Sequence, residues 1–358
     1  MSVHEILIAV MAAFAALGAL DRILGNRLGL AKEFEEGIMA MGSLALAMLG
    51  IITLAPVLAG LLKPLVVPVY GFLGADPAMF AGTILACDMG GAALALELTA
   101  DPQAAQLGGL LAGSMLGATL VFTIPVAMGI LAPEDRPYLA KGTLAGLVTI
   151  PLGILAGGLA AGFPLGMILG NLVPVVLIAG AVALGLWKAE NAMIRGFAAF
   201  GKGILALISL GLGAAIVEEL TGFVLIPGMA PLEEGFQTVG AIAIVLAGAF
   251  PLVAVLTRLL HKPLMSLGKL LGINDTAAGG LLATLANSIA TFGMVKHMDN
   301  RGKVVNIAFA VSAAFVFGDH MGFTAGFAPE MLGSVIIGKL AGGISAVAVA
   351  LWMTRQEG

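Results

Sequence analysis

The stretch PAMFAGTILACDMGGAALALEL, residues 77–98, decides the fold that this sequence predicts. Its two apolar arms are each about ten residues long, and the polar, glycine-rich centre CDMGG separates them. A helix of ten residues is about 15 Å long, which reaches only the middle of a bilayer core about 30 Å thick. We therefore predict a re-entrant hairpin of two half-helices. Residues 276–297, TAAGGLLATLANSIATFGMVKH, have the same form and predict a second one.

The composition around these two stretches is that of an all-α polytopic membrane protein. Of the 358 residues 60% are hydrophobic and 11% are charged, against about 25% charged residues in soluble domains. A net charge of −4 argues against nucleic-acid binding. The single cysteine excludes a disulfide framework, and the four scattered histidines predict no metal site. Phosphate-loop and zinc-protease motifs are absent, so we expect no enzyme and no cofactor.

The distribution of basic residues favours nine spans and two hairpins. Eleven segments are long enough to cross a bilayer. With Lys339 set aside because it lies inside the last span, the two sides receive 9 and 7 Lys or Arg residues if all eleven cross, whereas with two hairpins the division becomes 15 to 1. The strong bias is typical of membrane proteins and places the N-terminus outside and the C-terminus in the cytoplasm. The apolar segments are 4–22, 37–62, 77–98, 104–132, 138–161, 163–187, 196–217, 235–260, 276–297, 302–325 and 330–353.

An internal repeat divides the chain into two halves. Phe34-Glu35-Glu36-Gly37 is repeated as Leu232-Glu233-Glu234-Gly235, 198 residues later, and Lys63-Pro64-Leu65 as Lys262-Pro263-Leu264. We predict a first repeat over 1–162, a linker span over 163–195 and a second repeat over 196–358. With hairpins, five crossings separate the two starts, so the second repeat is inverted, as in many secondary transporters. If the hairpins cross fully, the repeats are parallel.

Polar residues at the two hairpin centres are the first candidates for a binding site. Asp88, beside Cys87 and Gly90, provides an anionic group for a cation or a proton; the alternative is a carboxylate that only caps the second half-helix. Asn287, Ser288 and Thr291 hold the matching place in the second hairpin. Their amide and hydroxyl groups suit a substrate hydroxyl, and the alternative is capping within the hairpin.

A second group of candidates lies in the long apolar segments. Asp319 and His320 are adjacent within 302–325, and Thr123 lies two residues before Pro125 in 104–132. An acid and an imidazole at membrane depth suit a second cation site, a proton relay or a buried hydrogen-bonded pair. Adjacent helical residues point about 100° apart, so we do not expect Asp319 and His320 to contact each other.

Three long motifs resemble the ethanolamine utilisation protein EutH family of ethanolamine permeases. They are FEEGIMAMGSLALAMLG (34–50), GADPAMFAGTILACDMGG (74–91) and LANSIATFGMVKHMDNRGKVVNIAFAVSAAFVFGDHMGF (285–323). The resemblance implies ethanolamine uptake across the bacterial cytoplasmic membrane. The acidic candidates agree with it, because a primary amine with a pKa near that of lysine, about 10.4, is cationic at neutral pH.

The predicted mechanism is alternating access in a lipid-embedded carrier, with homo-oligomerisation left open. The sequence is also compatible with two alternatives for another small polar solute: a proton- or sodium-coupled carrier, or a channel-like facilitator.

Overall fold

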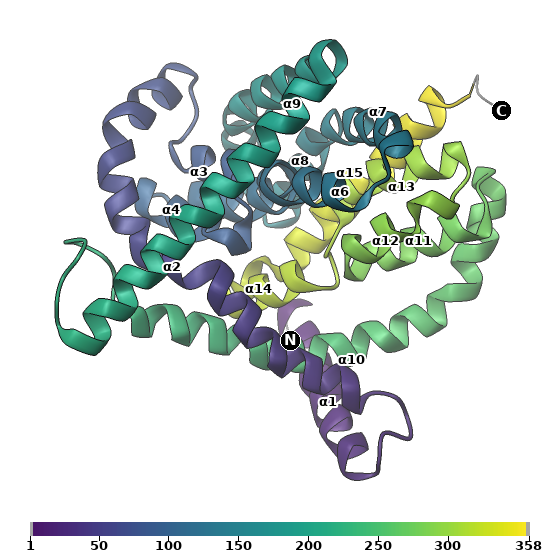
Figure 1. Cartoon of the computed structure of the whole chain (residues 1–358), viewed down its shortest axis with the longest axis horizontal. Coiled ribbons are helices and arrows are strands. Elements are labelled where there is room, and N and C mark those ends of the chain that lie inside the picture. Colours follow the sequence, from purple (N-terminus) through teal and green to yellow (C-terminus); the bar gives the residue numbers. More distant parts are fainter. Residues whose placement is uncertain (1–2, 356–358) are drawn as a thin grey trace.

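Long helices pack against one another throughout the protein (Figure 1). The computed structural model describes the backbone of residues 3–355 and their side chains except those of residues 3, 190, 194, 261 and 264. Within this range the chain is helical and contains no strand. Eight helical stretches are long and apolar enough to cross a membrane, which confirms an all-α polytopic protein. They are His4–Ile23, Ala31–Phe72, Pro102–Ile130, Pro133–Ala160, Leu165–Ala189, Asn191–Thr221, Leu232–Leu260 and Pro329–Met353.

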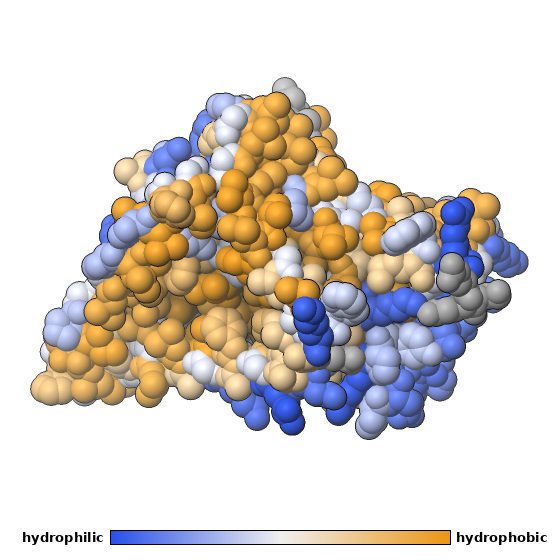
Figure 2. All heavy atoms as spheres, turned by 90° about the horizontal axis from the view of Figure 1, so that it is seen from above, coloured by the Kyte–Doolittle hydropathy of each residue, from blue (hydrophilic) through white to orange (hydrophobic). Residues whose placement is uncertain are grey.

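The surface of the molecule is also typical of a polytopic membrane protein. Apolar side chains cover most of the face in Figure 2, and polar side chains gather toward one side of it. Phe72, Leu61 and Ile244 are among the large apolar side chains that point outward. A continuous apolar surface of this extent is unfavourable in water and suits contact with lipid tails.

The first part of the chain contains two long helices, an interrupted pair and two further membrane-length stretches. The stretch Pro102–Ile130 is one run of helix in which two segments have the wider π-helical winding. The elements are α1 (Val3–Ile23), α2 (Ala31–Phe72), α3 (Ala78–Ile84), η1 (Cys87–Met89), α4 (Gly91–Leu98), α5 (Pro102–Gln106), η2 (Leu107–Gly117), η3 (Thr119–Thr123), α6 (Ile124–Ile130), η4 (Pro133–Asp135), α7 (Arg136–Leu147) and α8 (Ile150–Ala160).

The second part has a similar order of long and interrupted helices. Helix α9 runs from the predicted linker span into the next predicted span, with a kink at Ala189 in place of a loop. The elements are α9 (Leu165–Thr221), α10 (Leu232–Leu271), α11 (Asp275–Ala286), α12 (Ser288–Met294), η5 (Val295–His297), α13 (Asn300–Ala313), α14 (Asp319–Phe327), η6 (Pro329–Met331) and α15 (Leu332–Met353).

Both segments predicted as hairpins are pairs of helices whose outer ends meet. The Thr99 hydroxyl after α4 donates to the Asp76 carboxylate before α3 at 2.8 Å. In the same way the backbone N–H of Asn274, before α11, donates to the Asp299 carboxylate beyond α12 at 2.8 Å. Inside the second pair, the Thr291 hydroxyl donates to the Gly280 carbonyl at 3.0 Å. Residues eleven positions apart are about 16 Å apart along one straight helix, so the chain folds back on itself.

Residues 302–325, predicted as one span, form two helices instead. Helix α13 ends at Ala313 and α14 begins at Asp319. In the break, the N–H groups of Phe315 and Phe317 donate to the carbonyls of Thr284 and Leu285 at the end of α11, at 3.1 and 2.8 Å. These bonds replace the bonds of a continuous helix. The break was not predicted, because the residues around it are as apolar as their neighbours and hydropathy alone cannot detect a change of hydrogen-bond partners.

Helices α2 and α10 pack together in opposite directions. A side chain at Gly37 would collide with the backbone of Ala247, and one at Gly235 would meet the Leu49 side chain. Residue 37 of α2 thus lies against residue 247 of α10, and residue 49 lies against residue 235. The two helices are therefore antiparallel. Absence of a side chain at these glycines lets the two helix axes approach closely.

Candidate functional site

The turn between α3 and α4 presents Asp88 toward the centre of the bundle. The chain leaves α3 in an extended conformation at Leu85, makes the short helix η1 and enters α4 at Gly90, where φ is +90°. This left-handed conformation and the contact of Gly90 with the Ile51 side chain both require glycine. Among the described residues, no side-chain hydrogen bond caps η1 or α4. The Asp88 carboxylate does interact with the backbone N–H groups of Asp88 and Met89 in its own turn, so capping and binding both stay open for this residue.

The start of α14 presents Asp319 and His320 to the same region. Phe315, in the break before α14, has φ +62°, which is unusual and strained for a bulky residue. Its ring contacts those of Phe122 and His320, with centroids 5.5 and 5.4 Å apart. The hydrogen bonds to the end of α11 hold this conformation. Strained backbone held in this way is frequent at functional sites.

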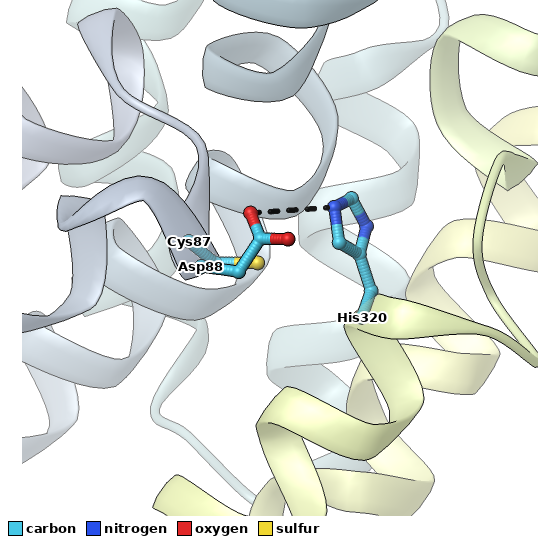
Figure 3. Close-up of side chains that lie close together, drawn as sticks. All are labelled: Cys87, Asp88 and His320. Carbon is cyan, nitrogen blue, oxygen red and sulfur yellow. Dashed lines mark ion pairs between the residues drawn. The ribbon is translucent and has the colours of Figure 1, made fainter. Parts of the chain in front are cut away.

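Asp88 and His320 face each other across the gap between these two elements (Figure 3). Asp88 Oδ1 lies 3.8 Å from His320 Nε2, and both side chains are largely buried. Asp319 is close enough to Asp88 for their charges to repel. Two carboxylates in apolar surroundings favour a bound cation, because an unbalanced buried charge is unfavourable.

Cys87 adds a third potential ligand atom to this pair. The Cys87 sulfur, an Asp88 oxygen and a His320 nitrogen all lie within 4.8 Å of one another. Thiolate, carboxylate and imidazole are the groups that zinc prefers. We expected no metal site because the histidines are scattered in the sequence. That reasoning missed His320, which the fold brings to the single cysteine.

Two cavities adjoin Asp319. The inner cavity has a volume of about 240 Å³ and is lined by Ser43, Leu44, Ala47, Ala86, Asp88, Met89, Ala118, Phe122, Phe315, Asp319 and His320. The outer cavity, of about 460 Å³, is lined by Glu33, Glu36, Phe250, Val253, Ala254, Thr257, Arg258, Ala286, Asn287, Phe317, Gly318 and Asp319. The inner one is smaller than the 300–1,000 Å³ typical of pockets for drug-sized ligands. It suits a small solute, and Asp319 lies between it and the outer cavity.

The other candidate residues occupy different places. Asn287 lines the outer cavity, and its side chain caps α12 by accepting from the Ile289 amide at 2.8 Å. Thr291 is buried inside the second helix pair, where its hydroxyl lies 2.8 Å from that of Thr284. Ser288 and Thr123 are also buried and line neither cavity. Of the candidates, the inner cavity brings together Asp88, Asp319 and His320. Cys87 and Gly90 lie in the turn that supports Asp88.

Lys339 is the charged residue near the site that we did not single out from the sequence. It lies in α15, is 1% exposed, and donates to the Ser114 carbonyl at 2.6 Å. It is near enough to Asp88 and His320 to interact with them electrostatically. A lysine within an apolar span is itself a sign of function, and that sign was present in the sequence.

The fold and the inner cavity define a multi-pass membrane protein with interrupted helices around a buried, charged site. The sequence matches the family "Ethanolamine utilisation protein, EutH" over residues 3–353. The chain belongs to this family, as its motifs indicated.

Relatives match along nearly their whole length. "Probable ethanolamine permease EutH" of Listeria monocytogenes serotype 1/2a (strain 10403S) is 59% identical over 356 residues, which cover 99% of this chain and 95% of the relative. The protein with the same name from Escherichia coli (strain K12) is 49% identical over 395 aligned positions, with 100% and 97% covered. "Uncharacterized protein YxeR" of Bacillus subtilis (strain 168) is 52% identical, with 100% and 96% covered. No solved structure matched the chain.

Proposed function

We propose that this protein transports ethanolamine, in its protonated form, across the membrane. One observation supports this most strongly: two carboxylates and an imidazole from two interrupted helices line one small cavity. The names of the Listeria and Escherichia relatives support the choice of substrate.

The inner cavity offers partners for both ends of an amino-alcohol. The ammonium group binds between Asp88 and Asp319, since each carboxylate compensates a positive charge. The faces of Phe122 and Phe315 add an attraction for the same group. The hydroxyl group binds near Ser43, whose own hydroxyl donates to the Ala40 carbonyl at 2.9 Å and keeps lone pairs for an incoming O–H.

We also propose that the chain is an inverted repeat with a boundary in the linker span, over 1–162, 163–195 and 196–358. The contacts between α2 and α10 support this repeat. At the shift of 198 residues, Gly37 corresponds to Gly235 and Leu49 corresponds to Ala247. A two-fold rotation therefore converts the Gly37–Ala247 contact into the Leu49–Gly235 contact. Gly50 against Ile208 and Gly248 against Met11 are related in nearly the same way. A self-complementary contact of this kind is typical of two-fold symmetry. The antiparallel course of the two equivalent helices supports inversion.

The two helix pairs are proposed to be re-entrant. Their outer ends meet through the Asp76–Thr99 and Asn274–Asp299 hydrogen bonds, so each pair has both ends on one side. Asp101 and Asp299, also 198 residues apart, cap the helices that follow by accepting from the backbone N–H groups of Gln103 and Gly302. The repetition of the same capping supports the shared origin of the two pairs.

The outer cavity is proposed to be the cytoplasmic vestibule of an alternating-access carrier. It is lined by Arg258, and the charge bias of the sequence assigns this residue to the cytoplasm. Asp319 lines both cavities. The substrate therefore passes from Asp88 to Asp319 and then to the vestibule, and movement of the hairpin-bearing helices closes the route on the other side.

Uptake of radiolabelled ethanolamine into proteoliposomes at pH 6 tests the proposal. We expect saturable uptake that unlabelled ethanolamine blocks and that empty vesicles lack. Uptake no greater than in empty vesicles would refute transport. Recovery of a chemically changed product from inside the vesicles would favour an enzyme.

A further inference from the structure

His320 presents an imidazole without a hydrogen bond to the inner cavity. The residue is 3% exposed, and within the described part of the chain its Nδ1 atom has no hydrogen-bond partner. The Nε2 atom lies 3.8 Å from Asp88 Oδ1, which is too long for a hydrogen bond. Figure 3 shows one ring nitrogen directed at Asp88 and the other turned away from it. A buried polar side chain without hydrogen bonds is rare, and here it points to a partner from a bound solute.

The surroundings of the His320 ring determine which nitrogen carries the proton. Burial in apolar surroundings disfavours the imidazolium, so the neutral ring has one N–H group and one lone pair. An N–H group at the buried Nδ1 would have no acceptor, and orphaned N–H groups are rarer than orphaned acceptors. We therefore assign the proton to Nε2, where the N–H group is directed at Asp88 and the inner cavity and can donate to a solute.

The spacing of these groups suits the two ends of an amino-alcohol. The nitrogen and oxygen atoms of ethanolamine are joined through two carbon atoms and lie about 3–4 Å apart, given single bonds of about 1.5 Å. The atoms of Asp88 and His320 that face each other have a similar separation of 3.8 Å. A solute whose ammonium group binds at Asp88 therefore brings its hydroxyl oxygen within reach of the His320 N–H group.

We propose that His320 is the residue that selects amines bearing a hydroxyl group. Its Nε2–H group donates to the hydroxyl oxygen of the substrate, while the substrate O–H donates to Ser43. An alkylamine of the same size would close the cavity over the imidazole N–H group and leave it without an acceptor. Binding is then about 5- to 150-fold weaker, the equivalent of about 1–3 kcal/mol. The inference rests on the proposed function and adds the chemical feature by which the substrate is recognised.

Competition between amines in the proteoliposome assay tests this proposal. n-Propylamine carries the same ammonium group as ethanolamine and has a methyl group in place of the hydroxyl. In the wild type we expect its inhibition constant against labelled ethanolamine to exceed the KM for ethanolamine at least about fivefold. A smaller ratio would overturn the inference. Failure of the proposed function is a different result, since it would appear as no ethanolamine uptake at all.

Variants of His320 separate its hydrogen bond from its packing on Phe315. His320→Leu is expected to raise the KM for ethanolamine at least about fivefold and to leave the inhibition constant of n-propylamine within about twofold, so that the ratio falls toward one. His320→Gln, whose amide N–H reaches the place of Nε2, is expected to retain the preference for ethanolamine. If His320→Leu leaves the ratio unchanged, or weakens both amines alike, His320 does not read the hydroxyl.

Two further variants serve as controls. His297→Leu makes the same change at an exposed histidine of η5 and is expected to alter neither constant. Asp88→Asn is expected to weaken both amines alike, because both carry the ammonium group. If His320→Leu does not fold, His320→Phe takes its place with the same expected and contradicting results, since it keeps a ring beside Phe315.

Discussion

Replacing Asp88 by asparagine removes one negative charge from the inner cavity and keeps the size of the side chain. The space beside Asp88 Oδ1 is small, since His320 Nε2 lies 3.8 Å away. An ammonium group bound about 4 Å from the carboxylate gains about 4 kcal/mol at an effective dielectric constant of about 20. A hydrogen bond to a charged group contributes about 1.5–3 kcal/mol by mutation. A loss of about 2–4 kcal/mol corresponds to a roughly 30- to 1,000-fold higher KM for ethanolamine.

The assay is the initial rate of labelled uptake into proteoliposomes over a range of ethanolamine concentrations. Asp101→Asn is the matched control, because Asp101 is exposed and caps α5 by accepting from the Gln103 amide, and asparagine caps equally well. An unchanged melting temperature of the Asp88→Asn protein separates lost binding from lost folding. A KM within twofold of the wild type would refute the role of Asp88 as the counter-charge of the substrate.

Three further predictions concern topology, metal binding and the second helix pair. A cysteine at position 300, in a Cys87→Ser background, is labelled from the cytoplasmic side; labelling only from outside would contradict the second hairpin. Zn²⁺ inhibits uptake, and Cys87→Ser or His320→Gln weakens this inhibition at least about tenfold; equal inhibition of both variants and wild type would show that zinc binds elsewhere. Thr291→Val is expected to lower the melting temperature. It leaves the buried Thr284 hydroxyl and Gly280 carbonyl without their hydrogen-bond partner, which costs about 1–3 kcal/mol. A raised KM with an unchanged melting temperature would instead make Thr291 a substrate ligand.

The sequence predicted the class of fold and the location of the interruptions in the two hairpin segments well. Eight of the nine predicted spans appear among the membrane-length helices, since hydropathy over twenty residues is a strong signal. The CDMGG and Asn287-Ser288 centres do interrupt their helices. Helix ends were less predictable: α2 continues to Phe72 through Pro56, Pro64 and Pro68, because neighbouring helices stabilise a proline-containing helix.

The sequence predicted single residues of the candidate site but not how they come together. Asp88, Asp319 and His320 were identified because charged groups in apolar segments are rare. Their meeting at one cavity was not predictable, because it depends on the break before Asp319. That break rests on hydrogen bonds from Phe315 and Phe317 to Thr284 and Leu285, 31 and 32 residues earlier, and the local sequence does not indicate these partners. The position of Lys339 beside the site depends equally on its contact with Ser114, 225 residues earlier in the chain.

The charged site is asymmetric even though the proposed scaffold is two-fold symmetric. The positions that correspond to Asp88 and Asp319 at a shift of 198 are Ala286 and Val121. The break before α14 corresponds to the junction of η2 and η3 at Ala118, where the first half keeps a continuous, π-wound helix. A single small molecule with an ammonium at one end and a hydroxyl at the other has no two-fold symmetry, so a symmetric pair of acids would bind it in two opposed orientations with equal affinity. In the proposed carrier, one acid from each half, at positions that do not correspond, would select one orientation. The proposed scaffold would then exchange between equivalent states while the substrate kept a defined direction toward the vestibule.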